Sequence, residues 1–297
     1  MSGKSAEQNK SVTAKAAGEF TIGNDLTVRR LGFGAMRITG KGVWGPPSDQ
    51  TEAMRVLKRT TELGIDFIDT ADSYGPEVSE ELIAEALHPY PASLVIATKG
   101  GFERPGPDKW VENGHPEHLI AACEGSLRRL RLERIDLYQL HRIDRNVPAE
   151  EQLGALKDLQ EQGKIKHIGL SEVNLEQLKH ARSIVDVVSV QNRYSVSDRG
   201  SEDVLDYCEE NGIAFIPWFP LAAGKLAAVD GLLGKLATKH KATPSQLALA
   251  WLLQRSPVML PIPGTSRVDH LEENVAAAVI KLEDSELGQL NRAASAG

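Results

Sequence analysis

The chain has 297 residues, of which 41% are hydrophobic, enough for a large core; this composition excludes a mostly disordered protein. A net charge of −7, from 34 Lys and Arg against 41 Asp and Glu, argues against a nucleic-acid partner, since phosphate backbones need a basic surface. The sequence contains neither an apolar run of about 18 residues nor a secretory signal, so no membrane partner is predicted. Cys123 and Cys208 make neither a disulfide framework nor a metal pattern, so we expect a cytoplasmic protein without a metal.

Short apolar runs alternate with helical patterns along the chain. Residues 1–18 predict a flexible tail, residues 19–29 a β-hairpin, and the chain from about residue 284 a last helix. Eight apolar runs lie between, without clean alternation of apolar and polar residues, which is typical of parallel strands buried on both faces. These runs occupy residues 31–35, 66–69, 94–98, 135–140, 165–170, 187–191, 213–217 and 258–262.

The segments between the runs carry helix signals. Two pairs have the spacing of a capping box, Asn174 with Gln177 and Thr243 with Gln246. Eight strands alternating with helices, without the two halves of a doubly wound sheet, predict a (β/α)8 TIM barrel. With no Pro-, Gly- or Ser-rich linker between apolar blocks, residues 19–297 are predicted to form one domain.

Two irregular stretches, residues 39–49 and 100–116, follow the first and third predicted strands. In a barrel these loops lie on the face where ligands bind. The first strand contains Gly32 and Gly34 but lacks the third glycine of a dinucleotide-binding fingerprint. A Rossmann domain is therefore not predicted.

Reactive side chains occur where three consecutive predicted strands end. Asp69 ends the second strand, Lys99 the third and His141 the fourth, and Tyr74 lies five residues beyond Asp69. Each alone has an ordinary explanation, as a helix cap, a solvated charge, a structural histidine or a packed tyrosine. Their joint placement at the carboxyl ends of barrel strands favours a catalytic role.

These four residue types together suit the donation of a proton to a carbonyl oxygen. Tyrosine has a reference pKa of about 10, and a nearby ammonium group such as Lys99 lowers it. A carboxylate such as Asp69 keeps the lysine charged and in place. A histidine beside Tyr74 orients the carbonyl group. Such a site does not supply electrons, so a hydride donor is implied.

Asp69, Tyr74, Lys99 and His141 resemble the catalytic tetrad of the aldo-keto reductases, and residues 67–75 resemble that family's first signature. The resemblance extends from about residue 30 to 274 and implies a (β/α)8 barrel. It also implies reduction of an aldehyde or ketone to an alcohol with NADPH, less often NADH. The loop of residues 42–47 and the pattern of the whole chain are similar to those of the bacterial pyridoxal-reductase-like branch of the family.

The resemblance assigns one group of residues to the nicotinamide. Ser171 and Gln191 match the residues that hold the carboxamide, whereas Glu172 stands where the family has Asn. Trp218 stands where the family has a Tyr stacked on the ring, and any flat aromatic face serves this purpose. Phe219 follows directly and is also assigned to the cofactor, because two consecutive aromatic residues at a strand end are not both expected to pack into the core.

A second group is assigned to the phosphates and the adenosine. Residues 221–226 resemble the loop that covers the pyrophosphate. In this loop Leu221 is assigned to the cofactor, and Gly224 allows close approach of the backbone. Residues 261–274 resemble the family's adenosine-phosphate site. Many relatives have Lys where Gly264 stands, and this departure weakens the preference for NADPH over NADH without removing it. The other residues assigned to this segment are Ser266 and Arg267 for the 2′-phosphate, and Glu273 and Asn274 for the adenine.

Four residues from the loops after strands one, three and four are candidates for substrate contact: Trp44, Phe102, Trp110 and Arg142. They predict an apolar, aromatic pocket with a guanidinium at its edge, suited to a flat or ring-bearing carbonyl compound such as pyridoxal. Trp110 also fits a simpler role, covering the barrel rim.

Two alternative functions remain open at this point. A strand-end lysine in a barrel also suits a Schiff-base aldolase acting through Lys99, although a carboxylate partner disfavours the neutral amine that this chemistry needs. The other alternative is an NADPH-binding sensor or docking module, as some members of the family are. An intact tetrad argues against a purely sensory role.

Overall fold

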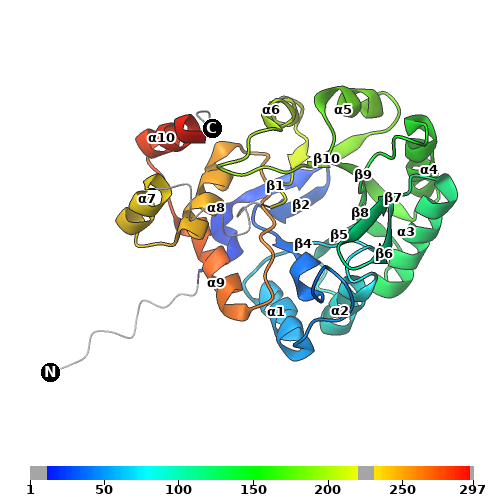
Figure 1. Ribbon diagram of the computed structural model, residues 1–297, viewed down its shortest axis with the longest axis horizontal. Coiled ribbons are helices and arrows are strands. Elements are labelled where there is room, and N and C mark those ends of the chain that lie inside the picture. Colours follow the sequence, from blue (N-terminus) through cyan, green and yellow to red (C-terminus); the bar gives the residue numbers. More distant parts are fainter. Residues whose placement is uncertain (1–11, 220–230, 295–297) are drawn as a thin grey trace.

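A computed structural model describes residues 12–219 and 231–294, with a parallel sheet of seven strands at its centre (Figure 1). The strand order β11-β10-β9-β8-β5-β4-β3 makes consecutive strands of this sheet neighbours. Most of their residues are buried, as the continuous apolar runs predict. The strands are β3 (Phe33–Gly34), β4 (Phe67–Asp69), β5 (Val95–Gly100), β8 (Ile135–Leu140), β9 (Ile165–Ser171), β10 (Val187–Gln191) and β11 (Ala214–Phe215).

The eighth predicted strand, residues 258–262, joins the two edges of this sheet. The amide of Phe215 donates to the carbonyl of Val258 at 2.9 Å, and the amide of Gly32 donates to the carbonyl of Pro261 at 3.0 Å. The segment therefore bonds both to β11 and to the residues that lead into β3. The eight predicted strands form a closed ring, and the predicted (β/α)8 barrel is confirmed.

The predicted N-terminal hairpin is present as β1 (Glu19–Ile22) and β2 (Leu26–Arg29), which pair antiparallel. Ile22 and Val28 are fully buried and belong to the same cluster as Phe67 and Val95, the first residues of β4 and β5. The hairpin therefore covers the end of the barrel where the strands begin. The opposite end, where the predicted catalytic residues lie, stays available for a ligand.

The predicted flexible tail of residues 1–18 needs a correction at its C-terminal end. Ala14–Ala17 forms a short 3-10 helix, η1, in which Ala14 is fully buried and its amide donates to the carbonyl of Leu63 at 2.9 Å. Two small alanine side chains allow this turn to pack against the end of the first barrel helix, a contact that composition does not reveal. Residues 1–11 lie outside the described residues.

Helices surround the barrel (Figure 1), and both predicted capping boxes are present, at Asn174 and Thr243. The predicted last helix is α10, which begins at Asp284. In the described ranges, no helix is both long and apolar enough to cross a membrane. The helices are α1 (Gln50–Glu62), α2 (Val78–Leu87), α3 (Pro116–Leu130), α4 (Ala149–Glu161), α5 (Leu175–Arg182), α6 (Glu202–Asn211), α7 (Leu232–His240), α8 (Pro244–Arg255), α9 (Val268–Ala276) and α10 (Asp284–Ala294).

The stretch of residues 100–116 is more regular than predicted. It contains an antiparallel hairpin of β6 (Phe102–Gly106) and β7 (Lys109–Glu112). Its strands are short and largely exposed, so they lack the apolar pattern that identifies a buried strand. The hairpin follows β5 and brings aromatic residues to the ligand-binding end of the barrel.

The first and last barrel strands approach each other through glycine. A Cβ atom on Gly34 would lie 2.6 Å from the carbonyl oxygen of Ile262, and one on Gly264 would lie 2.6 Å from the carbonyl oxygen of Gly34. Neither separation leaves room for a methyl group. Close backbone approach at this seam therefore requires glycine at both positions.

Gly34→Ala should destabilise the fold by about 1–3 kcal/mol, because the added methyl group forces the two strands apart. Gly154→Ala is the matched control. Gly154 lies within α4, its new methyl group would meet no described atom within 4 Å apart from its chain neighbours and the backbone of its own helix, and alanine is the better helix former. Urea denaturation of both variants measures the difference. Equal stabilities of Gly34→Ala and wild type would contradict the close approach.

Candidate active site

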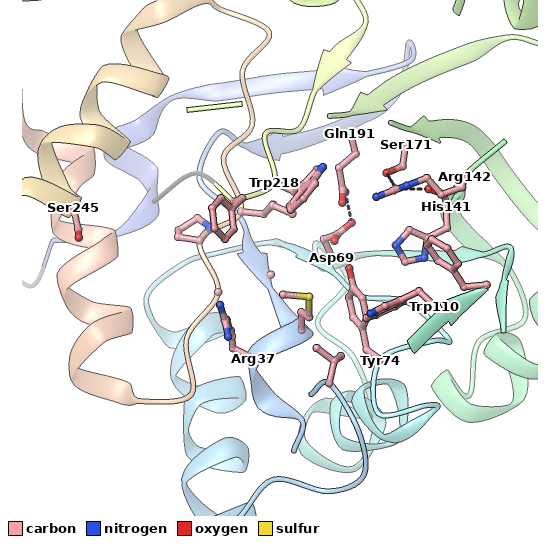
Figure 2. A pocket seen from close by; sticks show the side chains of 18 residues that line it. Arg37, Asp69, Tyr74, Trp110, His141, Arg142, Ser171, Gln191, Trp218 and Ser245 are labelled. Carbon is pink, nitrogen blue, oxygen red and sulfur yellow. Dashed lines mark hydrogen bonds between the residues drawn. The ribbon is translucent and has the colours of Figure 1, made fainter. Parts of the chain in front are cut away.

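A cavity of about 610 Å³ opens at the carboxyl ends of the barrel strands (Figure 2). Asp69, Tyr74 and His141 line it, whereas Lys99 is fully buried and contacts both Asp69 and Tyr74. Because parallel strands end at the same edge of the sheet, β4, β5 and β8 bring together residues that lie far apart in the sequence. All four predicted catalytic residues are therefore gathered in one place.

Lys99 is held between an acid and a phenol. Its Nζ donates to Oδ1 of Asp69 at 2.6 Å, to the carbonyl of Thr70 at 2.8 Å and to the hydroxyl of Tyr74 at 3.4 Å. Burial by itself lowers the pKa of Lys99, but attraction to Asp69 and Tyr74 outweighs it and leaves the pKa above its ordinary value. The amine is therefore an ammonium ion at neutral pH.

Tyr74 is a buried phenol with its hydroxyl next to this ammonium group. Burial raises the pKa of Tyr74 above its ordinary value, although Lys99 acts in the opposite direction. The prediction that Lys99 lowers the pKa is thus correct for its own contribution and wrong for the net direction, because burial of the hydroxyl dominates. With its pKa raised, Tyr74 keeps its proton at neutral pH.

His141 completes the group as a neutral imidazole. Burial lowers the pKa of His141 well below its ordinary value, and the positive charges of Lys99 and Arg142 act in the same direction. Its ring meets the Tyr74 ring edge to face at 5.9 Å between centroids, and its Nδ1 lies 3.4 Å from Oγ of Ser73. A neutral histidine here forms hydrogen bonds with a bound carbonyl group without competing for the proton of Tyr74.

Asp69 has two further partners that hold it in place. Its Oδ2 accepts from Nε2 of Gln139 at 3.0 Å and from Nε2 of Gln191 at 2.8 Å. Gln191, which the resemblance assigns to a carboxamide, does line the cavity. Gln139 is not among the predicted residues, although it lies two residues before His141 and so shares the inward face of β8.

Arg142 reaches across the mouth of the barrel to β9. Its Nη1 donates to Oγ of Ser171 at 3.0 Å and to the carbonyl of His141 at 2.6 Å, and its guanidinium lies 5.5 Å from the centre of the Phe102 ring. Ser171 (Figure 2) also lines the cavity, as does Phe102. The predicted carboxamide serine and the predicted substrate arginine are thus neighbours.

Glu172 and Trp218 form a pair. Oε1 of Glu172 accepts hydrogen bonds from the indole Nε1 of Trp218 and from the amide of Arg193. The indole of Trp218 lies along the cavity. Phe219 also lines it, because a φ of 60° at Phe219 interrupts the alternation of an extended chain. Both aromatic residues that the sequence assigns to the cofactor therefore line the cavity.

The predicted substrate residues form one wall of the cavity, with one exception. Phe102 and Trp110 line it, each edge to face with the ring of His141, at 4.6 Å and 6.3 Å between centroids. Trp44 lies outside the lining, and its neighbour Val43 takes the predicted place. The backbone of Trp44 pairs with Gly75, and its ring lies 5.8 Å from the guanidinium of Arg104.

Arg104, which the sequence does not single out, joins the loops around this wall. Its guanidinium lies 3.6 Å from the centre of the Trp110 ring and donates to the carbonyl of Ser73 at 2.6 Å and to the carbonyl of Val43 at 3.0 Å. These contacts connect the β6–β7 hairpin to the loops after β3 and β4. No local sequence pattern marks an arginine for this purpose.

Comparisons with known proteins agree with this geometry. Residues 30–295 match the model of the aldo/keto reductase family. The chain is 51% identical over 283 residues to an uncharacterized oxidoreductase of Schizosaccharomyces pombe, with 95% of this chain and 92% of the relative covered. It is 43% identical to a pyridoxine 4-dehydrogenase of Escherichia coli, with 92% and 96% covered. This chain belongs to the aldo/keto reductase family.

A solved structure supports the same assignment. An aldo-keto reductase of Klebsiella pneumoniae, crystallised in complex with NADPH, superposes with a TM-score of 0.78 at 26% identity, covering 92% of this chain and 94% of that one. The resemblance drawn from the motifs is confirmed, and the protein is an oxidoreductase of this family.

Membership of the aldo/keto reductase family leaves several predicted contacts untested. Leu221 and Gly224 lie outside the described residues. Gly264 lines the cavity, where a Cβ atom would lie 2.6 Å from the carbonyl oxygen of Gly34. Four further residues do not line the cavity and stay predictions: Ser266, Arg267, Glu273 and Asn274.

Asp72 lies in the loop between β4 and Tyr74, where burial disfavours the charged form of its carboxyl group. Its Oδ1 is buried and has no hydrogen-bond partner among the described residues. Burial, together with the nearby carboxylate of Glu80, raises the pKa of Asp72 to about 8, despite Arg129. At neutral pH the folded protein therefore holds a proton on Asp72.

This raised pKa predicts a pH-dependent stability. The folded state binds the proton more tightly than the unfolded chain, so stability is lost as pH rises from about 4 towards about 8. Asp72→Asn removes the titration, and its stability relative to wild type should rise across this range and level off above it. Urea denaturation at several pH values measures the effect, with the exposed Asp186→Asn as control. A difference that does not vary with pH would show that Asp72 is not perturbed.

Proposed function

We propose that this protein reduces an aldehyde or ketone to an alcohol with NADPH, and that Tyr74 is the proton donor. One observation carries the proposal: the buried Nζ of Lys99 bonds both to Asp69, at 2.6 Å, and to the hydroxyl of Tyr74, at 3.4 Å, on the wall of an open cavity. A phenol beside a fixed ammonium group is suited to giving up its proton and stabilising the resulting charge.

The cavity fits a nicotinamide cofactor. Trp218 offers an aromatic face, and Gln191 and Ser171 offer polar groups, within one lining that also contains Tyr74. Gly264 offers backbone without a side chain at the far part of the same lining. When bound, the reduced nicotinamide supplies a hydride to the carbonyl carbon. The solved Klebsiella pneumoniae relative in complex with NADPH supports the choice of this cofactor.

The chain's own residues supply the proton that the carbonyl oxygen needs. As negative charge develops on the carbonyl oxygen, the Tyr74 hydroxyl donates its proton to that oxygen and becomes a phenolate. The ammonium of Lys99 stabilises the phenolate, and Asp69 keeps Lys99 charged. The neutral imidazole of His141 orients the same oxygen by a hydrogen bond. Fixed donors aimed at a developing charge lower the barrier because they need no reorganisation.

The aromatic end of the cavity favours a ring-bearing substrate with an acidic group. Phe102 and Trp110 offer flat faces near His141, and Arg142 contributes a guanidinium that has no carboxylate partner among the described residues. A phenolic hydroxyl or carboxylate on the substrate ring would pair with it. The relative from Escherichia coli named pyridoxine 4-dehydrogenase supports a substrate of this kind.

The aldolase alternative lacks support from this geometry. Lys99 is fully buried, is not part of the cavity lining, and is an ammonium ion paired with Asp69. A Schiff base needs a neutral amine that reaches the substrate. The sensor alternative uses the same cofactor site, and measurable turnover separates it from the reductase.

Tyr74→Phe should lower kcat roughly 10²- to 10⁴-fold, because the proton donor is lost while the ring remains. The Kd for NADPH should stay within about twofold of wild type, since the ring packing is kept. Stopped-flow oxidation of NADPH by an aromatic aldehyde, and fluorescence titration of NADPH, measure the two quantities. Tyr207→Phe, outside the cavity, is the control. Near-normal turnover in Tyr74→Phe would overturn the assignment of the acid.

Arg142→Met should raise KM for aldehydes with an acidic ring substituent, pyridoxal and carboxybenzaldehyde among them, by roughly 10- to 100-fold. The KM for benzaldehyde should change much less, because it lacks the group that pairs with the guanidinium. The exposed Arg145→Met serves as control, and the Kd for NADPH is measured separately because Arg142 also bonds to Ser171. An equal change for both kinds of aldehyde would remove Arg142 from substrate recognition.

A further inference from the structure

Arg104 supports the wall formed by Phe102 and Trp110 from outside the cavity. Trp110 lines the cavity, whereas Arg104 is not part of the lining that the described residues form. The guanidinium of Arg104 lies over the Trp110 ring, 3.6 Å from its centre, and 5.8 Å from the centre of the Trp44 ring. A cation over an aromatic face is attracted to it, so Arg104 holds the indole of Trp110 from behind the wall.

Four hydrogen bonds of Arg104 end on backbone carbonyl groups. Its Nη1 donates to the carbonyl of Ser73 at 2.6 Å and to that of Val43 at 3.0 Å, and its Nη2 donates to the carbonyl of Gly42 at 3.0 Å. Its Nε donates to the carbonyl of Lys109 at 2.8 Å. A guanidinium presents five N–H donors in one rigid plane, whereas a lysine has three and cannot make all four bonds.

Two of these carbonyl groups stand directly before residues of the site. Ser73 precedes Tyr74, the proposed proton donor, and Lys109 precedes Trp110. The rings of Tyr74 and Trp110 meet edge to face, with 6.3 Å between their centres, and Figure 2 shows the two side by side. Arg104 thus bonds to the backbone on both sides of this contact and sets the distance between the proton donor and the wall.

The loops that this guanidinium joins are also bonded to one another. The amide of Asp108, in the turn between β6 and β7, donates to the carbonyl of Gly42 at 3.0 Å, and the amide of Gly75 donates to the carbonyl of Val43 at 3.3 Å. These backbone bonds remain when Arg104 is replaced. We therefore expect a substitution of Arg104 to leave the loops together and to release the indole on the cavity wall.

We propose that Arg104 is a positioning residue for ring-bearing carbonyl compounds, because it fixes Trp110 at the distance from Tyr74 that a substrate ring needs; this inference rests on the proposed function. A flat ring that packs against Trp110 has its carbonyl group within reach of the Tyr74 hydroxyl. A wall that is already ordered binds the ring more tightly, since no side chain has to be immobilised on binding. A short aliphatic aldehyde does not reach the wall and gains nothing from it.

Two aldehydes that differ only in the ring test this proposal. Arg104→Met should lower kcat/KM for phenylacetaldehyde roughly 10-fold, mainly through KM, because the wall is no longer ordered before the ring binds. For propanal, which has a methyl group in place of the phenyl ring, kcat/KM should change less than about twofold. Oxidation of NADPH over a range of aldehyde concentrations gives KM and kcat separately. Neither aldehyde carries an acidic group, so the comparison is independent of Arg142.

Two further variants serve as controls. Arg104→Lys keeps a cation beside the indole and should recover part of the loss. Arg182→Met is the matched control, because Arg182 also lies over an aromatic ring, that of Tyr207 at 5.5 Å, but on the outer helices α5 and α6. Its kcat/KM for both aldehydes should equal that of wild type.

A double-mutant cycle shows whether Arg104 acts through the wall. Trp110→Ala by itself should remove the preference for phenylacetaldehyde, so the addition of Arg104→Met should lower this preference no further. Losses that multiply in the double variant would overturn the proposal. An equal fall of kcat/KM for both aldehydes in Arg104→Met would also overturn it, because a purely structural role has that result.

The same assays separate failure of this proposal from failure of the proposed function. If wild type oxidises NADPH with neither aldehyde, the proposed function is wrong. If wild type turns over both aldehydes and Arg104→Met keeps the preference of wild type, the role of Arg104 is wrong. A cooperative thermal transition well above the assay temperature verifies that each variant is folded; if Arg104→Met fails this test, Arg104→Gln takes its place in the same comparison.

Discussion

The buried ion pair of Lys99 and Asp69 is the interaction on which the site depends. Removing two charges from water costs several kcal/mol for each ion, and loss of one partner from such a pair costs about 3–5 kcal/mol. Here Gln139, Gln191 and the carbonyl of Thr70 complete the hydrogen bonds of the pair. Side chains from β4, β5, β8 and β10 are thereby joined at the centre of the barrel, and the hydroxyl of Tyr74 is placed against a charge that cannot move.

In the proposed reaction, this arrangement separates the charged groups from the groups that contact the carbonyl oxygen. The permanent charges of Lys99 and Asp69 neutralise each other on one side of Tyr74, while His141 stays neutral on the other. Burial alone would make Tyr74 a weaker acid, as the raised pKa shows. On the resting phenol, the effect of the ammonium on the pKa is smaller than that of burial. In the proposed reaction, the ammonium acts when the phenolate forms, because it stabilises the new negative charge.

The sequence predicts those parts of the site that follow from strand order. Asp69 and His141 end apolar runs, and parallel strands in a barrel must end at one edge, so their meeting was predictable. Gln139 was within reach of the same reasoning, since it shares a face of β8 with His141. Arg104 was not, because its partners are backbone carbonyls of distant loops. Gly264 was visible in the sequence, but its close approach to Gly34 across the barrel seam was not, because no local pattern records such a contact.

Glu172 and Trp218 are two departures from the family pattern at the predicted nicotinamide site, and they are joined by a hydrogen bond. An indole N–H in a partly buried position needs an acceptor, and a phenol in its place would not present a donor at that edge of the ring. Glu172 supplies the acceptor for Trp218 and also accepts from the amide of Arg193. One carboxylate therefore holds both the indole ring and the backbone that follows β10. An asparagine is one methylene shorter and uncharged. The glutamate and the tryptophan therefore form one unit, and the orientation of the aromatic face depends on both.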